Sequence, residues 1–337
     1  IRKNILGWAV ALHPDDIGMY DPHWGSAVAV RDRIIDLGFT YVRIDFVWSW
    51  LEPSEDNLNN YAFRRYDILL QYLREKGISV IAVLGADIPS WEQANIRNLN
   101  KFWQEWKEYI ENISRVFGDK LYFYQILNEE NHPLHSQMYD DMEAIAFQYA
   151  YESIAKYDNS FETIVNAFAN YPGWYDQMVS WVTNAGQYID IFAIDHYPGT
   201  WTYTPVSDWT PLDSLITLIN IYGKKGAIME TGFSTLGYEW TPWGMPGYWH
   251  TEDDQEVFIN TALPLIKNKV INQNSISKNK IVLATWYELI GSGIQTMGDA
   301  FLCSSCAEQN MGILKNDFTL KMGYEDLQLR IREFTYF

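Results

Sequence analysis

Short apolar runs alternate with longer amphipathic stretches along the whole chain of 337 residues. The apolar runs have the length and composition of strands, and the stretches between them carry apolar residues at helical spacing. The predicted strands lie at about 4–12, 40–46, 78–84, 121–127, 162–168, 188–195, 225–230 and 281–287. The predicted helices cover 27–37, 61–76, 99–117, 138–157, 174–183, 211–222, 252–269 and 323–333. A predicted helix therefore follows each predicted strand.

This order predicts an α/β fold, a single (β/α)8 TIM barrel that spans residues 1–337 as one catalytic domain. Glycines at predicted helix ends, as in Asp36-Leu37-Gly38, support the boundaries. No Pro/Gly/Ser-rich linker and no low-complexity stretch divides the chain. The alternative is a doubly wound sheet, which needs fewer strands and usually a glycine-rich first turn. The chain reads Ala11-Leu12-His13-Pro14-Asp15 at that point, which favours the barrel.

Two glutamates follow apolar, strand-like runs. Asn128-Glu129 follows the run at 121–127, and Glu230 follows the run at 225–229. In a barrel, catalytic groups lie at the carboxyl ends of the strands, so these two carboxylates are expected across the barrel mouth from each other. Such a pair, about 5 Å apart, is what retaining glycoside hydrolysis requires. Each glutamate alone could equally be a strand-end residue paired with an Arg or Lys.

The composition narrows the range of partners. The formal net charge of −18 argues against nucleic acid and against anionic membrane surfaces. The 15 Trp and 23 Tyr residues offer aromatic faces that can stack on sugar rings, although many of them must pack the core. An oligosaccharide, polysaccharide or glycoside is therefore the expected substrate. The sequence leaves the oligomeric state open.

No run of apolar residues is long enough to predict a membrane span. The chain opens with Ile1 and not with Met, so a leader segment could have been removed. This favours a secreted or extracytoplasmic location over a cytoplasmic one.

We expect neither a metal nor a cofactor. Cys303 and Cys306 form one C-x-x-C pair without the second pair of a structural zinc site, so a loop disulfide or two free thiols is expected. His132 and His135 follow Glu129 without the helical H-x-x-x-H spacing of a metal site. No glycine-rich phosphate loop is present.

Five segments, in order and at barrel spacing, resemble clan A, the superfamily of retaining (β/α)8 glycoside hydrolases. They are Arg43-Ile44-Asp45, Asn128-Glu129, Asp195-His196-Tyr197-Pro198, Met229-Glu230-Thr231-Gly232 and Ala284-Thr285-Trp286-Tyr287-Glu288. The segment at 311–317 is similar to the entry into the clan's eighth helix. The family within the clan is not decided, because residues 189–201 resemble endo-galactanases, whereas 83–85 and 88–91 resemble exo-acting xylosidase-type and cellulase-type relatives.

The resemblance implies roles for the matching residues. Glu129 would be the general acid/base, and Glu230 would be the nucleophile that forms the glycosyl-enzyme. Asn128 would bind the sugar 2-hydroxyl group. Arg43 would hold Glu230 ionised, and Tyr197 would donate a hydrogen bond to the same carboxylate.

Further residues are predicted to bind substrate. The resemblance implies that Trp286 forms the floor of the sugar subsite by stacking. His196 and Tyr197 are adjacent, where many relatives separate them by one residue, and strand alternation favours Tyr197 as the inward residue. His13 and Asp45 at the rim could bind hydroxyl groups; alternatively, His13 lies in a solvated turn and Asp45 pairs with a cation.

Aromatic residues cluster just past the predicted strand ends. We expect about two of four tryptophans, Trp48, Trp50, Trp91 and Trp201, to line the groove. The aromatic residues of the long loop at 238–249 are expected to form a substrate wall, because Pro and Gly residues are interleaved with them.

The sequence thus predicts a retaining glycoside hydrolase that cleaves β-linked saccharides by double displacement. The alternative is a catalytically silent carbohydrate-binding barrel, against which the presence of both carboxylates and Arg43 speaks. A metal-dependent hydrolase is a further alternative. The sugar, the linkage and endo or exo action are left open.

Overall fold

The computed structural model describes residues 6–15, 17–20, 27–93, 98–133, 136, 138, 142–200, 204–236, 238–240, 246–291, 306–315 and 317–335. Eight parallel strands close into a barrel in the order β1-β10-β7-β6-β5-β4-β3-β2. They are β1 (Gly7–Leu12), β2 (Tyr41–Phe46), β3 (Ser79–Leu84), β4 (Phe123–Ile126), β5 (Glu162–Phe168), β6 (Ile191–Asp195), β7 (Lys225–Thr231) and β10 (Ile281–Trp286). The predicted (β/α)8 fold is confirmed.

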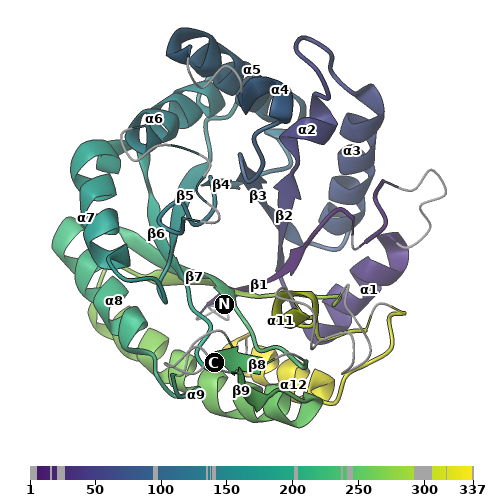
Figure 1. The fold of residues 1–337 in the computed structure, drawn as a ribbon, viewed down its shortest axis with the longest axis vertical. Helices are drawn as coiled ribbons and strands as arrows, with labels where there is room; N and C mark the ends of the chain where they lie inside the picture. Colours follow the sequence, from purple (N-terminus) through teal and green to yellow (C-terminus); the bar gives the residue numbers. More distant parts are fainter. Residues whose placement is uncertain are drawn as a thin grey trace.

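Helices form a ring around the barrel (Figure 1). The helices that follow the eight strands are α1 (Ala27–Leu37), α3 (Asn60–Arg74), α5 (Leu99–Phe117), α6 (Glu143–Ile154), α7 (Trp174–Ala185), α8 (Thr210–Tyr222), α9 (Glu252–Ile276) and α12 (Tyr324–Thr335). Shorter elements lie in the connections, namely α2 (Trp48–Leu51), α4 (Ser90–Gln93), η2 (Gly186–Tyr188) and α11 (Cys306–Gln309). An antiparallel hairpin of β8 (Tyr238–Trp240) and β9 (Pro246–Trp249) follows β7, where the sequence predicted a loop.

Helix α5 illustrates how the sequence pattern becomes the outer layer. Its buried residues include Phe102, Trp106, Ile110, Ile113 and Phe117, which recur at the spacing of one helix face. Burying each such side chain contributes roughly 1.5–3 kcal/mol. The helix packs against α6 and ends at the Gly118 cap.

The barrel interior has two layers of different character. Side chains that alternate inward fill its lower part with a small apolar cluster, made of Ala9, Ile81, Phe123, Ile164, Ile191, Ala193, Ala227, Met229 and Leu283. Polar and ionisable side chains occupy the carboxyl ends of the same strands. The lower layer therefore closes the barrel and leaves one end for chemistry.

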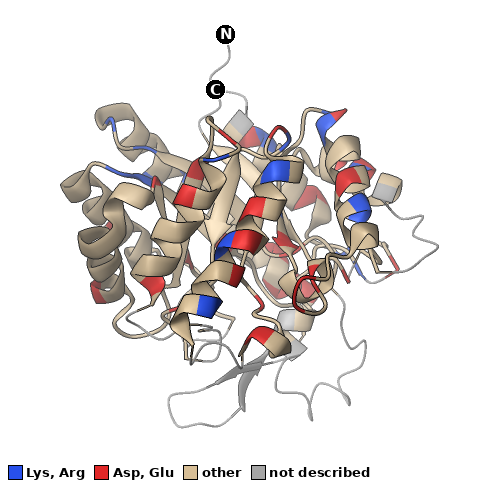
Figure 2. Ribbon diagram, turned by 90° about the horizontal axis from the view of Figure 1, so that it is seen from above, with Lys and Arg blue, Asp and Glu red and all other residues tan. Residues whose placement is uncertain are grey.

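Acidic and basic side chains are interspersed along the outer helices. Figure 2 shows no cluster of Lys and Arg among the residues that it colours. Within the described ranges, no helix combines the length and apolar character needed to cross a bilayer.

Close packing between β7 and β10 generates a test of the fold. A Cβ atom added to Gly232 would lie 2.2 Å from the carbonyl oxygen of Tyr287, so the backbone must shift. Gly232→Ala is expected to destabilise the protein by roughly 1–3 kcal/mol in urea unfolding. In the control Gly186→Ala, the nearest atom is the movable Cγ2 of Val182 at 3.2 Å. Equal unfolding midpoints for the two variants would contradict this packing.

Candidate active site

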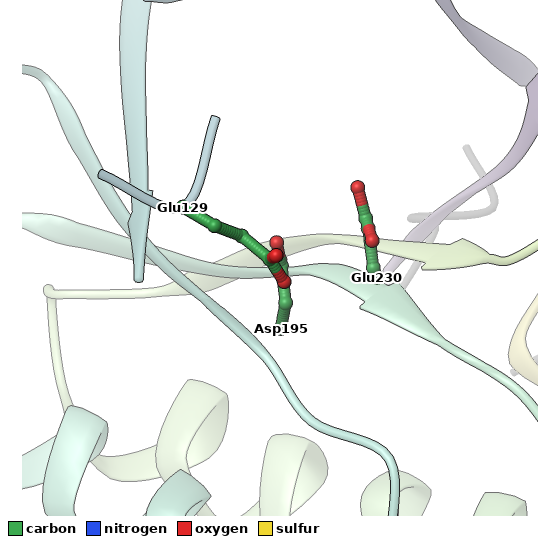
Figure 3. A group of neighbouring side chains, drawn as sticks. All are labelled: Glu129, Asp195 and Glu230. Atoms are coloured by element: carbon green, nitrogen blue, oxygen red, sulfur yellow. The ribbon is translucent and has the colours of Figure 1, made fainter. Parts of the chain in front are cut away.

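Glu129 is presented by a strained turn after β4. Leu127 and Glu129 have φ angles of 63° and 51°, in the left-handed region that residues with side chains rarely adopt. Leu127 is buried, and Glu129 is 3% exposed. Such conformations persist where the surrounding structure holds them, and they cluster at functional sites. The turn directs the Glu129 carboxyl group toward Asp195 (Figure 3).

Glu230 owes its position to an irregularity in β7. Ile194 pairs with Ile228, but the next residue of β6, Asp195, pairs with Glu230, so β7 contains one extra residue. Met229 faces the barrel interior, and strict alternation would then turn Glu230 toward the helices. The bulge instead brings Glu230 into the mouth, as bulges near active sites often do.

Arg43 of β2 lies at the centre of the site and is 2% exposed. Its Nη2 atom lies 2.8 Å from Oε1 of Glu230 and donates to Oδ1 of Asn128 at 2.8 Å. Its Nε atom donates to Oε1 of Gln125 at 2.7 Å. Burial disfavours the charge, but the surrounding carboxylates, Glu230 first, raise the pKa of Arg43 above its usual value. The guanidinium therefore stays charged.

Tyr197 binds the other oxygen of Glu230. Its hydroxyl group donates to Oε2 at 2.5 Å. Burial, and then the charge of Glu230, raises the pKa of Tyr197 well above the usual value, so the O–H donor persists. The two oxygens of Glu230 are thus held by Arg43 and Tyr197, which fixes the carboxylate in one orientation.

A network of side-chain amides orients Asn128. Its Oδ1 atom accepts hydrogen bonds from Arg43, from Gln125 at 3.0 Å and from Asn166 at 2.8 Å. Because Oδ1 is fixed in this way, the Nδ2 group must face away from the network. This leaves the Nδ2 group of Asn128 able to donate to a bound molecule.

Three carboxyl groups meet at the mouth. One oxygen each from Glu129, Asp195 and Glu230 lies within 4.8 Å of the others (Figure 3). Burial, followed by the charges of Glu230 and Glu129, raises the pKa of Asp195 well above its usual value. Three carboxyl groups can also attract a metal ion, but Arg43 and Tyr197 already engage Glu230, and the guanidinium repels a second cation.

A second polar cluster lies at the rim beside β1, β2 and β10. Nδ1 of His13 lies 2.7 Å from Oδ2 of Asp45, and its Nε2 lies 2.9 Å from the hydroxyl group of Tyr287. Oε2 of Glu288 is 3.8 Å from the same Nε2 atom. Burial alone would raise the pKa of Asp45, but the charge and hydrogen bond of His13 lower it overall. This cluster presents several donors and acceptors beside the three carboxyl groups.

Three residues that were predicted to bind substrate contact other parts of the protein. Trp286 is fully buried and packs against Phe258 of α9, because Leu283, Thr285 and Tyr287 take the inward positions of this strand. His196 hydrogen bonds to Asn170 at 3.0 Å and to the carbonyl oxygen of Asp208 at 2.7 Å, away from Tyr197. Trp91 donates to the carbonyl oxygen of Glu52 at 3.0 Å.

The sequence also predicted that other tryptophans and the loop at 238–249 line the groove. Trp48 is fully buried, and Trp50 packs against the core. Trp201, the side chains of 238–249, His135 and Cys303 lie outside the described residues.

No role was predicted from the sequence for four residues that lie at the site, namely Gln125, Asn166, Asp195 and Tyr287. A signal existed for three of them: Gln125, Asn166 and Asp195 are polar residues inside otherwise apolar strands, and all are at most 2% exposed. Polar groups in such positions are normally held by partners, as they are here. For Tyr287, the signal was its alternation with Leu283 and Thr285.

Comparison with known proteins shows which solved structures share this fold. No protein-family model and no curated protein matches the sequence. A family 39 glycoside hydrolase from Bacteroides cellulosilyticus WH2 superimposes with a TM-score of 0.65 at 15% identity, covering 98% of this chain and 65% of the other. The exo-β-1,4-mannosidase Op5Man5 from Opitutaceae bacterium strain TAV5 gives 0.71 at 14% identity, covering 98% and 60%. A β-glucosidase named 1317 gives 0.67 at 14% identity, covering 97% and 98%.

These structures are glycoside hydrolases, and they share the barrel expected from the clan A resemblance. At such low identity, the likeness establishes the fold of this chain and leaves the family unresolved. The chain spans about two thirds or less of the first two structures.

The buried position of Arg43 generates a test of the site. Arg43→Met removes the cation from among buried carboxyl groups and leaves them uncompensated. We expect a loss of roughly 3–5 kcal/mol in the free energy of unfolding, measured with urea. The control Arg74→Met breaks an exposed pair with Asp119, and little change is expected. An Arg43 variant as stable as the Arg74 variant would contradict the described network.

Proposed function

We propose that the protein is a retaining glycoside hydrolase that cleaves β-linked saccharides by double displacement. One observation carries the proposal. The carboxyl groups of Glu129 and Glu230 approach within 4.8 Å, and both oxygens of Glu230 are engaged by Arg43 and Tyr197. Retaining enzymes hold their two carboxyl groups about 5–5.5 Å apart, whereas inverting enzymes leave a wider gap for water.

The different surroundings of the two glutamates support different roles. Glu230, beside the Arg43 guanidinium, is the nucleophile: its carboxylate attacks the anomeric carbon as the bond to the leaving oxygen breaks. Glu129, whose carboxyl group lies beside those of Asp195 and Glu230, is the acid that protonates that oxygen. Glu129 then removes a proton from water, which attacks the anomeric carbon and releases Glu230 as a carboxylate.

Other polar groups supply contacts to the sugar. The Nδ2 group of Asn128, oriented by three donors to its Oδ1, is placed to bind a hydroxyl group beside the anomeric carbon. His13, Asp45 and Tyr287 form the neighbouring hydroxyl-binding rim. Tyr287 also packs in one cluster with Tyr197, which supports its place in this rim.

The β-configuration of the substrate is supported by the names of the similar structures, which include a β-glucosidase and an exo-β-1,4-mannosidase. We further propose that the barrel is one catalytic domain and acts without a cofactor. A panel of aryl β-glycosides with galactose, glucose, mannose, xylose and fucose identifies the sugar.

Replacement of the nucleophile gives the test. Glu230→Ala should abolish turnover of the aryl β-glycoside that the unchanged protein cleaves, because no covalent intermediate can form. Azide should restore cleavage and give the α-glycosyl azide, since a small anion enters the space of the lost carboxylate. Product analysis by NMR measures the configuration.

Glu129→Gln is the matched variant. Its activity should fall by roughly 10²–10⁴-fold on a glycoside whose poor leaving group needs protonation. The fall should be much smaller on a dinitrophenyl glycoside, whose leaving group needs no proton. Full activity of the Glu230 variant would contradict the assignment. Binding of saccharides without cleavage by the unchanged protein would instead support the silent carbohydrate-binding barrel.

A further inference from the structure

Asp195, at the end of β6, is a third carboxyl group whose role the two-glutamate mechanism does not explain. It is fully buried. The charged or titratable groups that face it come from four other positions: Arg43 on β2, Glu129 after β4, Glu230 on β7 and Tyr197 two residues on. Within the described part of the site, three carboxyl groups thus lie within 4.8 Å of one another, and one of them, Glu230, contacts the guanidinium of Arg43.

The charges at this point cannot all be present together. If all three carboxyl groups were ionised, the buried cluster with Arg43 would carry a net charge of −2. Like charges at this separation among buried groups cannot all persist, so the cluster retains protons. Both oxygens of Glu230 already face donors, namely the guanidinium of Arg43 and the O–H of Tyr197. The protons that the cluster retains must therefore be held by Asp195 and Glu129.

The hydrogen bonds around Asp195 show which of its oxygens can carry a proton. Oδ2 accepts from Nδ2 of Asn166. The orientation of that amide is fixed, because its own Oδ1 accepts from Gln125 at 2.9 Å. Oδ1 of Asp195 is buried, and no donor among the described residues reaches it. A buried oxygen without a donor suits an O–H group that donates, and the carboxyl group of Glu129 lies beside it, with one oxygen of each group within 4.8 Å of the other (Figure 3).

We propose that Asp195 is a positioning residue that stays a neutral carboxylic acid and donates its O–H to the carboxyl group of Glu129. The inference rests on the proposed function, because it assigns Asp195 to the acid/base of that reaction. The bond directs the proton of Glu129 away from Asp195 and toward the substrate. After Glu129 has protonated the leaving oxygen, the same O–H stabilises its carboxylate until water returns a proton.

The direction of the pKa of Asp195 agrees with this role. Burial is the largest cause of its rise, followed by the charges of Glu230 and Glu129, while Arg43 opposes it. A carboxyl group in such surroundings is neutral near neutral pH and can act as a donor.

Two substitutions test whether Asp195 acts as a neutral hydrogen-bond donor or as a carboxylate. Asp195→Asn keeps the shape and offers an N–H donor to Glu129, whereas Asp195→Ala removes the donor. On the glycoside that the unchanged protein cleaves, kcat of the Asn variant should fall by less than about 10-fold, and that of the Ala variant by about 10²-fold. The basic limb of the pH profile should move to higher pH in the Ala variant only, because the Glu129 carboxylate loses its donor. Equal losses in the two variants would overturn the inference.

A second measurement does not depend on activity. Folded Asp195 keeps a proton that the unfolded chain releases above about pH 4, so its contribution to stability is complete below that pH. The contribution is lost as the pH rises through the raised pKa of the folded state. Asp195→Asn has no proton to lose. The urea midpoint of this variant should therefore rise relative to that of the unchanged protein between about pH 5 and about pH 8.

Asp158→Asn is the matched control, a buried aspartate between α6 and β5 at the amino ends of the strands. This variant measures the effect of losing a buried aspartate carboxyl group elsewhere in the fold. A midpoint of Asp195→Asn that runs parallel to that of the unchanged protein between about pH 5 and about pH 8 would overturn the inference. If the unchanged protein cleaves no glycoside, the proposed function fails, and the pH dependence still decides whether Asp195 is neutral.

Discussion

The buried ion pair between Arg43 and Glu230 is the interaction on which the barrel mouth depends. Removing two charges from water is unfavourable, and the pair is stable only because further hydrogen bonds satisfy both partners. Arg43 also donates to Gln125 and Asn128, and Tyr197 donates to Glu230. The same cation therefore holds the carboxyl group of one glutamate and orients the amides beside the other.

The division of the barrel interior explains how these polar groups are tolerated. The apolar cluster in the lower part provides burial and closes the sheet, so the upper part need not contribute hydrophobic energy. At the upper end, the strained turn at Leu127–Glu129 and the bulge in β7 bring side chains inward that regular strands would not. Stability and chemistry are thus assigned to different ends of the same strands.

The sequence predicted the eight strands and the helices after them, because each element carries its own periodicity and the barrel repeats one unit. It also predicted Glu129 and Glu230 at strand ends and Arg43 within the second strand, and the structure brings the three residues together. The position of Trp286 could not be predicted, since a one-residue difference in register reverses the face of a strand. Asp195, the third carboxyl group beside Glu129 and Glu230, was assigned no role because no local pattern shows that three separate strand ends meet.

The configuration of the first product tests the central claim most directly, namely that Glu129 and Glu230 stand at the spacing of a retaining pair. The unchanged protein is incubated with an aryl β-glycoside that it cleaves, and the anomeric proton of the released sugar is followed by NMR before mutarotation. The account predicts that the β anomer appears first and that the α anomer grows in later. Initial release of the α anomer would contradict double displacement and the roles assigned to both glutamates.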